Sequence, residues 1–237
     1  MQTEEIEVQT PDGPMPVYEA RPDADPKGAV IVIQEAFGVN DHIEDVTRRF
    51  ADAGYLALAP HIFHRSGGGV VEYGDFEKVM PHFMALSDEK IMQDVDATLA
   101  RAAELGIPAS RTAIVGFCFG GRVTFLAAVN RKLAAGVGFY GGGIVTGRSG
   151  AMPGLLDRIP DMPTPWLGLF GDKDAHIPIE DVEKLRAALG DASVDADIVR
   201  YPDADHGFHC DARESYHAES SADAWERTLD WIDAHLG

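Results

Sequence analysis

Residues 112–121 read Thr-Ala-Ile-Val-Gly-Phe-Cys-Phe-Gly-Gly and carry the strongest structural signal in this chain. A short β-branched run leads into a Gly-x-Cys-x-Gly turn, and a helix-forming stretch, 122–129, follows it. A nucleophile in such a strand-turn-helix unit sits in a sharp, strained turn, so the residues two before and two after it must be too small to collide. Gly116 and Gly120 occupy these positions, which predicts that Cys118 is a nucleophile.

Short apolar runs alternate with longer amphipathic runs along the rest of the chain. The runs 5–9 and 15–19 predict an N-terminal hairpin. Further strands are expected at 29–34, 55–59, 112–116, 135–139, 166–170 and 196–201, and helices at 43–53, 87–104, 121–129, 179–189 and 222–235. A less regular excursion, 66–87, begins with a glycine-rich loop. The repeated β-α-β order predicts an α/β fold in one domain, 1–237, with a mostly parallel central sheet flanked by helices on both faces.

Composition argues against several classes of protein. A net charge of −19 over 237 residues disfavours nucleic acid and anionic membrane surfaces, because both select basic patches. No apolar run approaches the roughly 20 residues that span a bilayer, and the acidic stretch 1–8 does not resemble a secretory signal. Two cysteines without an export signal indicate free thiols in a reducing compartment. We therefore expect a cytoplasmic protein, a monomer or homodimer, that acts on a small molecule.

Three polar residues follow three of the expected strands. Cys118 comes after 112–116, Asp174 after 166–170 and His206 after 196–201. Ligands of parallel sheets bind beyond the carboxyl ends of the strands, so these side chains are expected at one edge. The order nucleophile, acid, histidine is that of the α/β-hydrolases. The pattern predicts a catalytic triad in which Cys118 attacks a carbonyl, His206 transfers the proton and Asp174 orients the imidazole.

Each member of this triad has an alternative. A buried structural thiol is the alternative for Cys118, and an ordinary loop histidine is the alternative for His206. Asp172 competes with Asp174 for the role of the acid, because both follow the same expected strand.

A second group of residues follows His206. Together with His206, the residues His209, Cys210 and Asp211 are of metal-ligating types, but their spacing matches no standard zinc site. We therefore expect neither a metal nor a cofactor. Cys210 is either an inert loop thiol or a disulfide partner of Cys118 under oxidation.

A carboxylate follows the expected strand 29–34. Glu35 stands next to apolar residues, where a carboxylate is costly unless it is hydrogen bonded, and we expect it to belong to the site. Its alternative is to cap the helix that follows. The same position supplies the second oxyanion-hole amide in the predicted fold, so the backbone N–H groups of Ala36 and Phe119 are the expected pair.

At these residues the chain resembles the dienelactone hydrolase family. The marks are Gln34-Glu35-x-Phe37-Gly38-Val39-Asn40, the cysteine turn, the Gly-x-x-Asp of 171–174 and the Asp-His-Gly-Phe of 205–208. The resemblance covers essentially the whole chain and implies an α/β-hydrolase fold with Cys118, Asp174 and His206 as the triad. It further implies that Glu35 bonds to the resting Cys118 and is displaced when an anionic substrate binds.

One part of the family pattern is absent. Family members that act on dienelactone usually bind its carboxylate with two arginines, one in the loop after the catalytic histidine and one in the excursion before the cysteine turn. Here Cys210 stands four residues past His206, and 67–86 contains no arginine. A neutral thiol does not replace a guanidinium fork. Arg122 and Arg213 are the candidates to take over this role.

The sequence thus predicts a cysteine-dependent hydrolase of a small ester or lactone that works through an acyl-thioester intermediate. A general carboxylesterase or thioesterase with an altered pocket is the enzymatic alternative. The non-enzymatic alternative is a ligand-binding or redox-sensing protein of the same fold. The expected pocket residues are Phe37, Tyr73, Lys78, His82 and Phe208.

Overall fold

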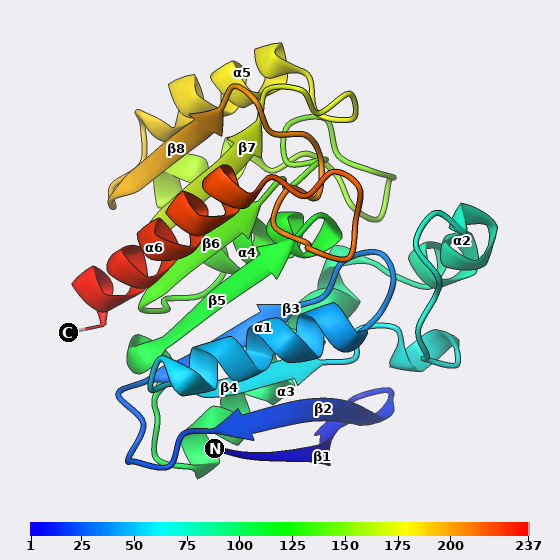
Figure 1. The fold of residues 1–237 in the computed structure, drawn as a ribbon, viewed down its shortest axis with the longest axis vertical. Coiled ribbons are helices and arrows are strands. Elements are labelled where there is room, and N and C mark those ends of the chain that lie inside the picture. Colours follow the sequence, from blue (N-terminus) through cyan, green and yellow to red (C-terminus); the bar gives the residue numbers. More distant parts are fainter. Residues whose placement is uncertain (237) are drawn as a thin grey trace.

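The computed structural model describes residues 1–236, and its eight strands form one sheet in the order β1-β2-β4-β3-β5-β6-β7-β8. The strands from β4 across to β8 are parallel, and β1 and β2 pair antiparallel at one edge (Figure 1). Their bounds are β1 Gln2–Thr10, β2 Gly13–Arg21, β3 Ala29–Ile33, β4 Leu56–Pro60, β5 Thr112–Phe117, β6 Ala135–Phe139, β7 Trp166–Gly171 and β8 Ala196–Tyr201. The expected mostly parallel sheet is confirmed.

Helices cover both faces of this sheet. In Figure 1, α1 and α6 lie in front of the strands, and α3 and α4 lie behind them. Every residue of β3, β5, β6 and β7 is buried, as expected of parallel strands covered on both faces. The helices are α1 Asp41–Asp52, α2 Phe76–Met84, α3 Asp88–Glu104, α4 Phe119–Ala128, α5 Ile179–Leu189 and α6 Ala218–His235.

Two stretches differ from the expectation. The excursion 66–87 contains a helix, α2, which begins where Asp75 accepts a hydrogen bond from the Lys78 amide. The terminal helix α6 begins at Ala218, four residues before the expected start, because His217 caps it by accepting from the Ser220 amide at 3.3 Å. In the described residues, none of the helices is long and apolar enough to cross a membrane.

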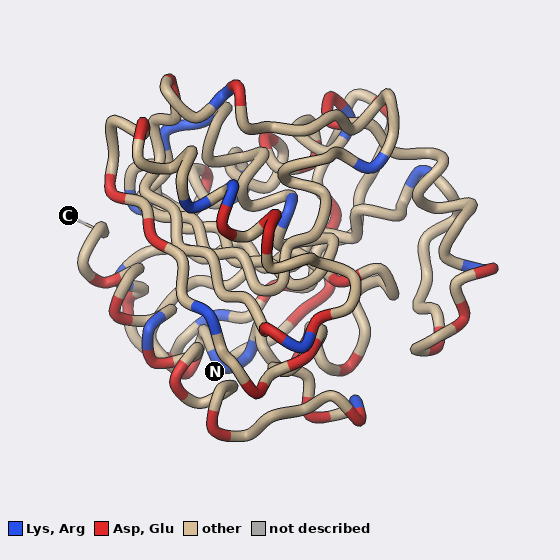
Figure 2. The backbone as a smooth tube through the Cα atoms, turned by 90° about the horizontal axis from the view of Figure 1, so that it is seen from above, with Lys and Arg blue, Asp and Glu red and all other residues tan. Residues whose placement is uncertain are grey.

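The strand ends locate the functional edge of the sheet. The arrows of β3 and β5 in Figure 1 point to the side on which α2 projects from the body of the protein. Figure 2 shows that the positions of acidic and basic residues are interspersed around the outside of the molecule. The net charge of −19 is therefore spread over the surface and does not by itself select a ligand.

Candidate active site

Cys118 occupies the strained turn between β5 and α4. Its backbone has φ 53° and ψ −112°, which lies outside the ordinary regions for a residue with a side chain. The amide of Cys118 donates to the Phe139 carbonyl of β6 at 3.0 Å, and this bond helps to hold the turn. The half-buried thiol therefore stands at the N-terminus of α4, where a helix favours negative charge.

The two glycines around Cys118 permit this turn. A Cβ on Gly116 would lie 2.3 Å from the Gly120 carbonyl oxygen, and a Cβ on Gly120 would lie 2.4 Å from the Ile33 carbonyl oxygen. Both obstacles are backbone atoms of packed strands and turns, which cannot swing aside as a flexible side chain can. The steric requirement inferred from the sequence therefore has a structural basis.

Substitution at this turn should be costly. We expect Gly120→Ala to lower the free energy of unfolding by about 2–3 kcal/mol, because relieving the clash must move the backbone of β3 or of the turn. Urea denaturation measures the change. Gly150→Ala is the matched control, since a Cβ at Gly150 meets nothing within 4 Å. Equal stability of the two variants would show that the turn has room for a side chain.

Asp174 and His206 meet at the ends of β7 and β8. The His206 Nδ1 lies 2.6 Å from Asp174 Oδ2, and Asp174 Oδ1 accepts from the backbone N–H of His176 at 2.8 Å. Both carboxylate oxygens of Asp174 are thus engaged, so the carboxylate and the imidazole have a fixed relative orientation. Asp172 instead receives two hydrogen bonds from Arg200, at 2.7 and 2.8 Å.

The electrostatic surroundings of His206 favour its cation. Burial opposes the imidazolium, but the neighbouring Cys118 and Asp174 outweigh burial and raise the pKa of His206. Opposite charges within a few ångströms favour the charged form of a titrating group. The arrangement therefore favours an imidazolium at His206, between Cys118 and Asp174.

Ala36 and Phe119 are the residues whose backbone N–H groups were expected to form the oxyanion hole. Within residues 1–236, neither the Ala36 amide nor the Phe119 amide donates to another backbone or side-chain group. Ala36 lines the same cavity as Cys118, and Phe119 is the first residue of α4. Both amides therefore lack a partner within the described part of the chain, as donors of an oxyanion hole must.

Glu35 is completely buried behind the cavity. Its Oε1 accepts from Arg213 Nη1 at 3.3 Å, whereas its Oε2 has no partner in the described part of the chain. Burial raises the pKa of Glu35, and the positive charges of Arg213 and His206 only partly oppose that rise. The bond to resting Cys118 that the resemblance implies is not the one found here, because a charge-assisted bond to a guanidinium takes its place.

A cavity of about 400 Å³ opens above Cys118. Its lining combines Cys118 and His206 with apolar side chains and two arginines. The side chains in this lining include Phe37, Phe76, Val79, Met80, Phe83, Cys118, Arg148, His176, His206 and Arg213. Arg148 and His176 have no marked motif in the sequence, although His176 follows Asp174 by only two residues. Arg213 lies in the site, whereas Arg122 is buried and donates two hydrogen bonds to Asp88.

The five expected pocket residues divide into two groups. Phe37 lines the cavity, and Tyr73 packs against its ring with centroids 4.9 Å apart. Tyr73, Lys78, His82 and Phe208 do not line it, which corrects the expectation for these four. Lys78 is exposed and pairs with Asp75, and His82 bonds to Ser66 at 2.6 Å while stacking on Phe63. Phe208 is fully buried and packs in the core against aromatic rings.

The residues after His206 have separate partners. His209 bonds to Ser221 at 2.9 Å, and the thiol of Cys210 lies 3.3 Å from the Tyr73 hydroxyl. Across residues 1–236, no group of three or more His, Cys, Asp or Glu side chains is arranged to hold a metal ion. Cys118 and Cys210 are both free thiols.

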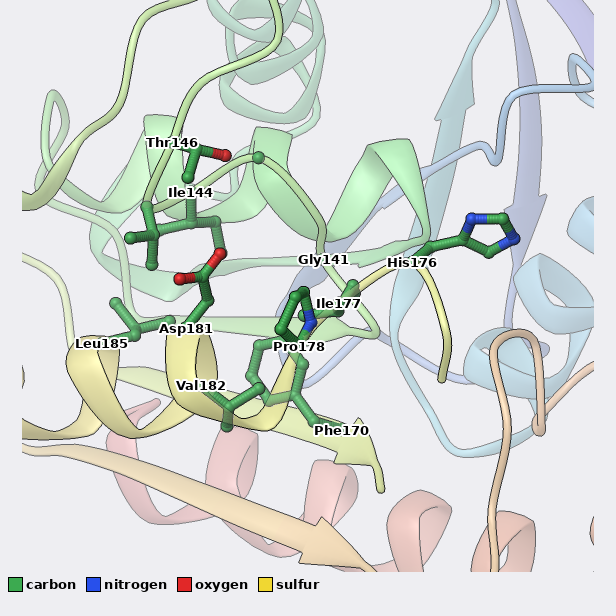
Figure 3. Close-up of a pocket in the computed structure, with 12 residues that line it drawn as sticks. Gly141, Ile144, Thr146, Phe170, His176, Ile177, Pro178, Asp181, Val182 and Leu185 are labelled. Carbon is green, nitrogen blue, oxygen red and sulfur yellow. The ribbon is translucent and has the colours of Figure 1, made fainter. Parts of the chain in front are cut away.

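A smaller hollow adjoins the cavity. Its volume is about 50 Å³. Figure 3 shows Ile144, Asp181 and Leu185 around this space, while the imidazole of His176 points away from it. The ring of His176 instead lies 5.6 Å from that of His206, centroid to centroid. The hollow is too small for an ester substrate, and His176 belongs to the larger cavity.

Comparisons with known proteins agree with this architecture. The chain matches the model of the dienelactone hydrolase family over residues 15–236. It is 42% identical over 226 residues to a Yersinia pestis protein named "Putative carboxymethylenebutenolidase", covering 93% of this chain and 84% of that protein. An Escherichia coli K12 protein of the same name is 42% identical over 231 residues, covering 94% and 83% of the two chains.

A solved structure is similar over nearly the full length. The "Putative Dienelactone Hydrolase" from Klebsiella pneumoniae superposes with a TM-score of 0.90 at 41% identity, and the match covers 98% of each chain. The fold, the family match and these relatives all point to hydrolysis of esters or lactones. This chain is therefore a member of the dienelactone hydrolase family and an ester or lactone hydrolase of the α/β-hydrolase fold.

Proposed function

We propose that this hydrolase cleaves its ester or lactone through a Cys118-His206-Asp174 triad and an acyl-thioester intermediate. The observation that carries the proposal is that Cys118 and His206 line one cavity while Asp174 Oδ2 lies 2.6 Å from His206 Nδ1. A nucleophile, a base and a group that orients the base are the parts that covalent acyl transfer needs. They follow the carboxyl ends of β5, β7 and β8, which are parallel strands of one sheet.

In the first half of the reaction, Cys118 is the nucleophile. His206 holds the thiol proton as an imidazolium, and the thiolate adds to the carbonyl carbon of the substrate. The amides of Ala36 and Phe119 donate to the resulting oxyanion. When the carbon-oxygen bond of the ester breaks, His206 gives the proton to the departing alkoxide, and the acyl group remains on sulfur as a thioester.

In the second half, water replaces the alcohol. His206, neutral after the first half, takes a proton from water, and the hydroxide adds to the thioester carbonyl. Collapse of this second adduct expels the Cys118 thiolate and releases the carboxylic acid. Asp174 keeps the imidazole in the tautomer that presents Nε2 to the reacting atoms and stabilises the imidazolium in both halves.

Glu35 supports the site from behind. Its hydrogen bond to Arg213 fixes a guanidinium at the cavity wall. A carboxylate near the thiol also disfavours a premature thiolate through like charge. We propose that a substrate anion competes with Glu35 for Arg213. Binding of this anion weakens the hydrogen bond between Arg213 and Glu35 and thereby favours the thiolate of Cys118.

A small enol lactone or activated ester is the substrate class that best suits a thiolate. The tetrahedral adduct expels a stabilised alkoxide in competition with the thiolate, whereas an amine leaves poorly. The relatives named carboxymethylenebutenolidase support a lactone. A broader carboxylesterase or thioesterase is favoured by the apolar wall of the cavity, which exceeds what a compact lactone requires.

Trapping the intermediate tests the proposal. Acid quenching during turnover of 4-nitrophenyl butyrate should give a protein species heavier by one butyryl group, and peptide mapping should place that group on Cys118. Asp174→Asn should increase the trapped fraction if it slows deacylation more than acylation. Cys210→Ser is the control and should retain the adduct. An adduct on a residue other than Cys118 during turnover contradicts the thioester route. The absence of any adduct under conditions that show a burst of nitrophenol also contradicts it.

A further inference from the structure

Arg122 is a fully buried arginine close to the nucleophile that takes no part in the proposed reaction. It lies on the first turn of α4, four residues after Cys118, and its side chain is 0% exposed. A buried arginine is unfavourable unless its guanidinium is both paired and hydrogen bonded. The contacts of this side chain therefore show what its burial stabilises.

The guanidinium of Arg122 makes four hydrogen bonds to two other parts of the chain. Nη1 and Nη2 donate to the two carboxylate oxygens of Asp88, at 2.6 and 3.1 Å, in the two-point geometry that arginine favours. Nε donates to the Gly143 carbonyl at 3.1 Å, and Nη2 also donates to the Pro153 carbonyl at 2.7 Å. Arg122 thus connects α4 with the first residue of α3 and with the segment between β6 and β7.

Residues 141–155 of that segment form an arm that lines the active-site cavity. The arm folds back on itself, because the Leu155 amide donates to the Ile144 carbonyl and the Arg148 amide donates to the Met152 carbonyl, both at 2.8 Å. The residues of the arm in the cavity lining are Gly142, Gly143, Thr146, Gly147 and Arg148. The position of the arm therefore affects the width of the cavity.

The arm also contacts α2, which supplies the apolar part of the cavity lining. The guanidinium carbon of Arg148 lies 5.5 Å from the centre of the Phe83 ring, and Phe83 lines the same cavity. Arg148 itself is exposed, so this contact is made at the surface. A displacement of the arm would separate it from α2 and widen the cavity on this side.

The packing beneath the arm is incomplete. The hollow of about 50 Å³ described above lies between the arm and α5, and Figure 3 shows Ile144 of the arm and Leu185 of α5 around it. Side chains that border a void lose contacts there, so packing on α5 does not by itself fix the arm. The arm is held from its buried side by Arg122 and by the Asp88 amide, which donates to the Ala151 carbonyl at 3.0 Å.

We propose that Arg122, paired with Asp88, is a positioning residue that holds the arm in place and thereby limits the size of the acyl group that the cavity accepts. The inference rests on the proposed function, because the acyl group in question is the one that Cys118 carries. Arg122 acts through the carbonyl groups of the arm and not on the substrate, since its side chain is completely buried. Its loss should therefore change the size preference more than the reaction at Cys118.

The first test measures the arm without any substrate. Trypsin under native conditions should cut the exposed Arg148–Ser149 bond only when the arm leaves its place, because proteolysis needs a locally opened chain. We expect this cleavage to be at least about tenfold faster in Arg122→Met than in the wild type. Mass spectrometry of the fragments identifies the bond that is cut.

A second arginine–aspartate pair provides the matched control. Arg131 donates to both carboxylate oxygens of Asp96, at 2.7 and 2.6 Å, so this pair also connects α3 with the chain that follows α4. Its remaining guanidinium bond goes to the Asn130 carbonyl, and both members of the pair lie outside the cavity lining described above. Arg131→Met should therefore leave cleavage at Arg148 unchanged.

The second test compares a small with a bulky acyl group. The probes are 4-nitrophenyl acetate and 4-nitrophenyl trimethylacetate, and the readout is the ratio of their kcat/KM values. A difference of a few methyl groups in a fitted pocket changes kcat/KM by about tenfold or more. We expect Arg122→Met to lower the acetate-to-trimethylacetate ratio by about five- to tenfold relative to the wild type, with kcat for acetate within a few-fold.

Two further variants separate positioning from folding. Arg122→Met leaves the Asp88 carboxylate unpaired, which is destabilising, whereas removal of both charges is often tolerated. The double variant Arg122→Met/Asp88→Leu should therefore be more stable to urea than Arg122→Met and still show fast cleavage and the lowered ratio. Arg122→Lys can pair with Asp88 but lacks the fork that also reaches Gly143 and Pro153, so it should restore the ratio only in part.

The outcomes distinguish this inference from the proposed function. A folded double variant with the cleavage rate and the ratio of the wild type overturns the inference, because the arm then stays in place without Arg122. Reduced stability of Arg122→Met with an unchanged ratio also overturns it and leaves Arg122 a structural residue. Turnover that persists in Cys118→Ala defeats the proposed function, whereas the cleavage at Arg148 still reports whether Arg122 holds the arm.

Discussion

Cys118→Ala is expected to lower kcat/KM for 4-nitrophenyl butyrate by about 10⁴-fold or more, because removal of a triad nucleophile leaves only binding and oxyanion stabilisation. The alanine side chain is slightly smaller than the thiol and fits the same turn, so the fold should persist. Initial rates of nitrophenol release measure the loss, and circular dichroism with urea unfolding checks that the variant is folded.

The second cysteine provides the control for this experiment. Cys210 is buried and bonds to the Tyr73 hydroxyl rather than facing the reaction, so Cys210→Ser should retain activity within a few-fold. If Cys118→Ala keeps most of the activity and Cys210→Ser loses it, the wrong thiol has been assigned. A loss in both variants, with both folded, means that Cys210 takes part in a way that the triad does not include.

The triad should also act as a unit. Once Cys118 is absent, His206→Ala has no thiol proton to manage, so the double variant should be nearly as active as Cys118→Ala alone. Additive losses would indicate that His206 works independently of the nucleophile. That result would fit a direct attack by water and would contradict the acyl-thioester route.

The sequence was most informative where backbone sterics leave few choices. The role of Gly116 and Gly120 in the turn around Cys118 could be predicted, because any Cβ at these positions meets backbone atoms closer than 2.5 Å. The three residues of the proposed triad could be assigned to one edge of the sheet because parallel strands bring their carboxyl ends together there, whatever the loops between them do. The spacing alone could not decide whether Asp172 or Asp174 is the acid that partners His206. The structure differs at the two residues because Arg200, on the neighbouring strand, binds Asp172.

Prediction failed where side-chain direction and loop path decide the outcome. Lys78 and His82 lie in the same excursion as the apolar wall, but they fall on faces of α2 that point elsewhere. Pro81 inside α2 and the glycines before it concealed the helix. Arg148 carries no motif, and only the path of the loop after β6 brings it to the cavity.

Two buried histidines lie behind the site and predict a strong loss of stability in acid. His42 and His209 are 6% and 1% exposed, with ring centroids 6.3 Å apart. Burial lowers the pKa of His42 to about 4, against a raising effect of Asp211. Burial and the neighbouring His42 and Arg49 lower the pKa of His209 to about 3. Both rings are therefore neutral in the folded protein at pH 7.

The sign of the pH effect follows from these two pKa values. An unfolded chain protonates each histidine near pH 6.5, while the folded protein resists protonation until about pH 4 for His42 and about pH 3 for His209. The unfolded state thus binds more protons throughout this interval, and stability falls as pH falls from 6.5. Two protons correspond to a slope of about 2.7 kcal/mol per pH unit near pH 5, so the protein should lose several kcal/mol by pH 4.

Urea unfolding between pH 4 and pH 7.5 measures this slope. A variant at His209 tests whether the buried histidines cause it. His209 stacks between Phe117 and Trp225, with centroids at 5.5 and 5.9 Å, so His209→Phe keeps an aromatic ring in place while removing one titrating group. Its absolute stability can fall, because Ser221 loses its partner, but its slope near pH 5 should decrease by about 1.4 kcal/mol per pH unit. An unchanged slope in a folded His209→Phe protein would mean that carboxylates, rather than this buried pair, govern acid unfolding.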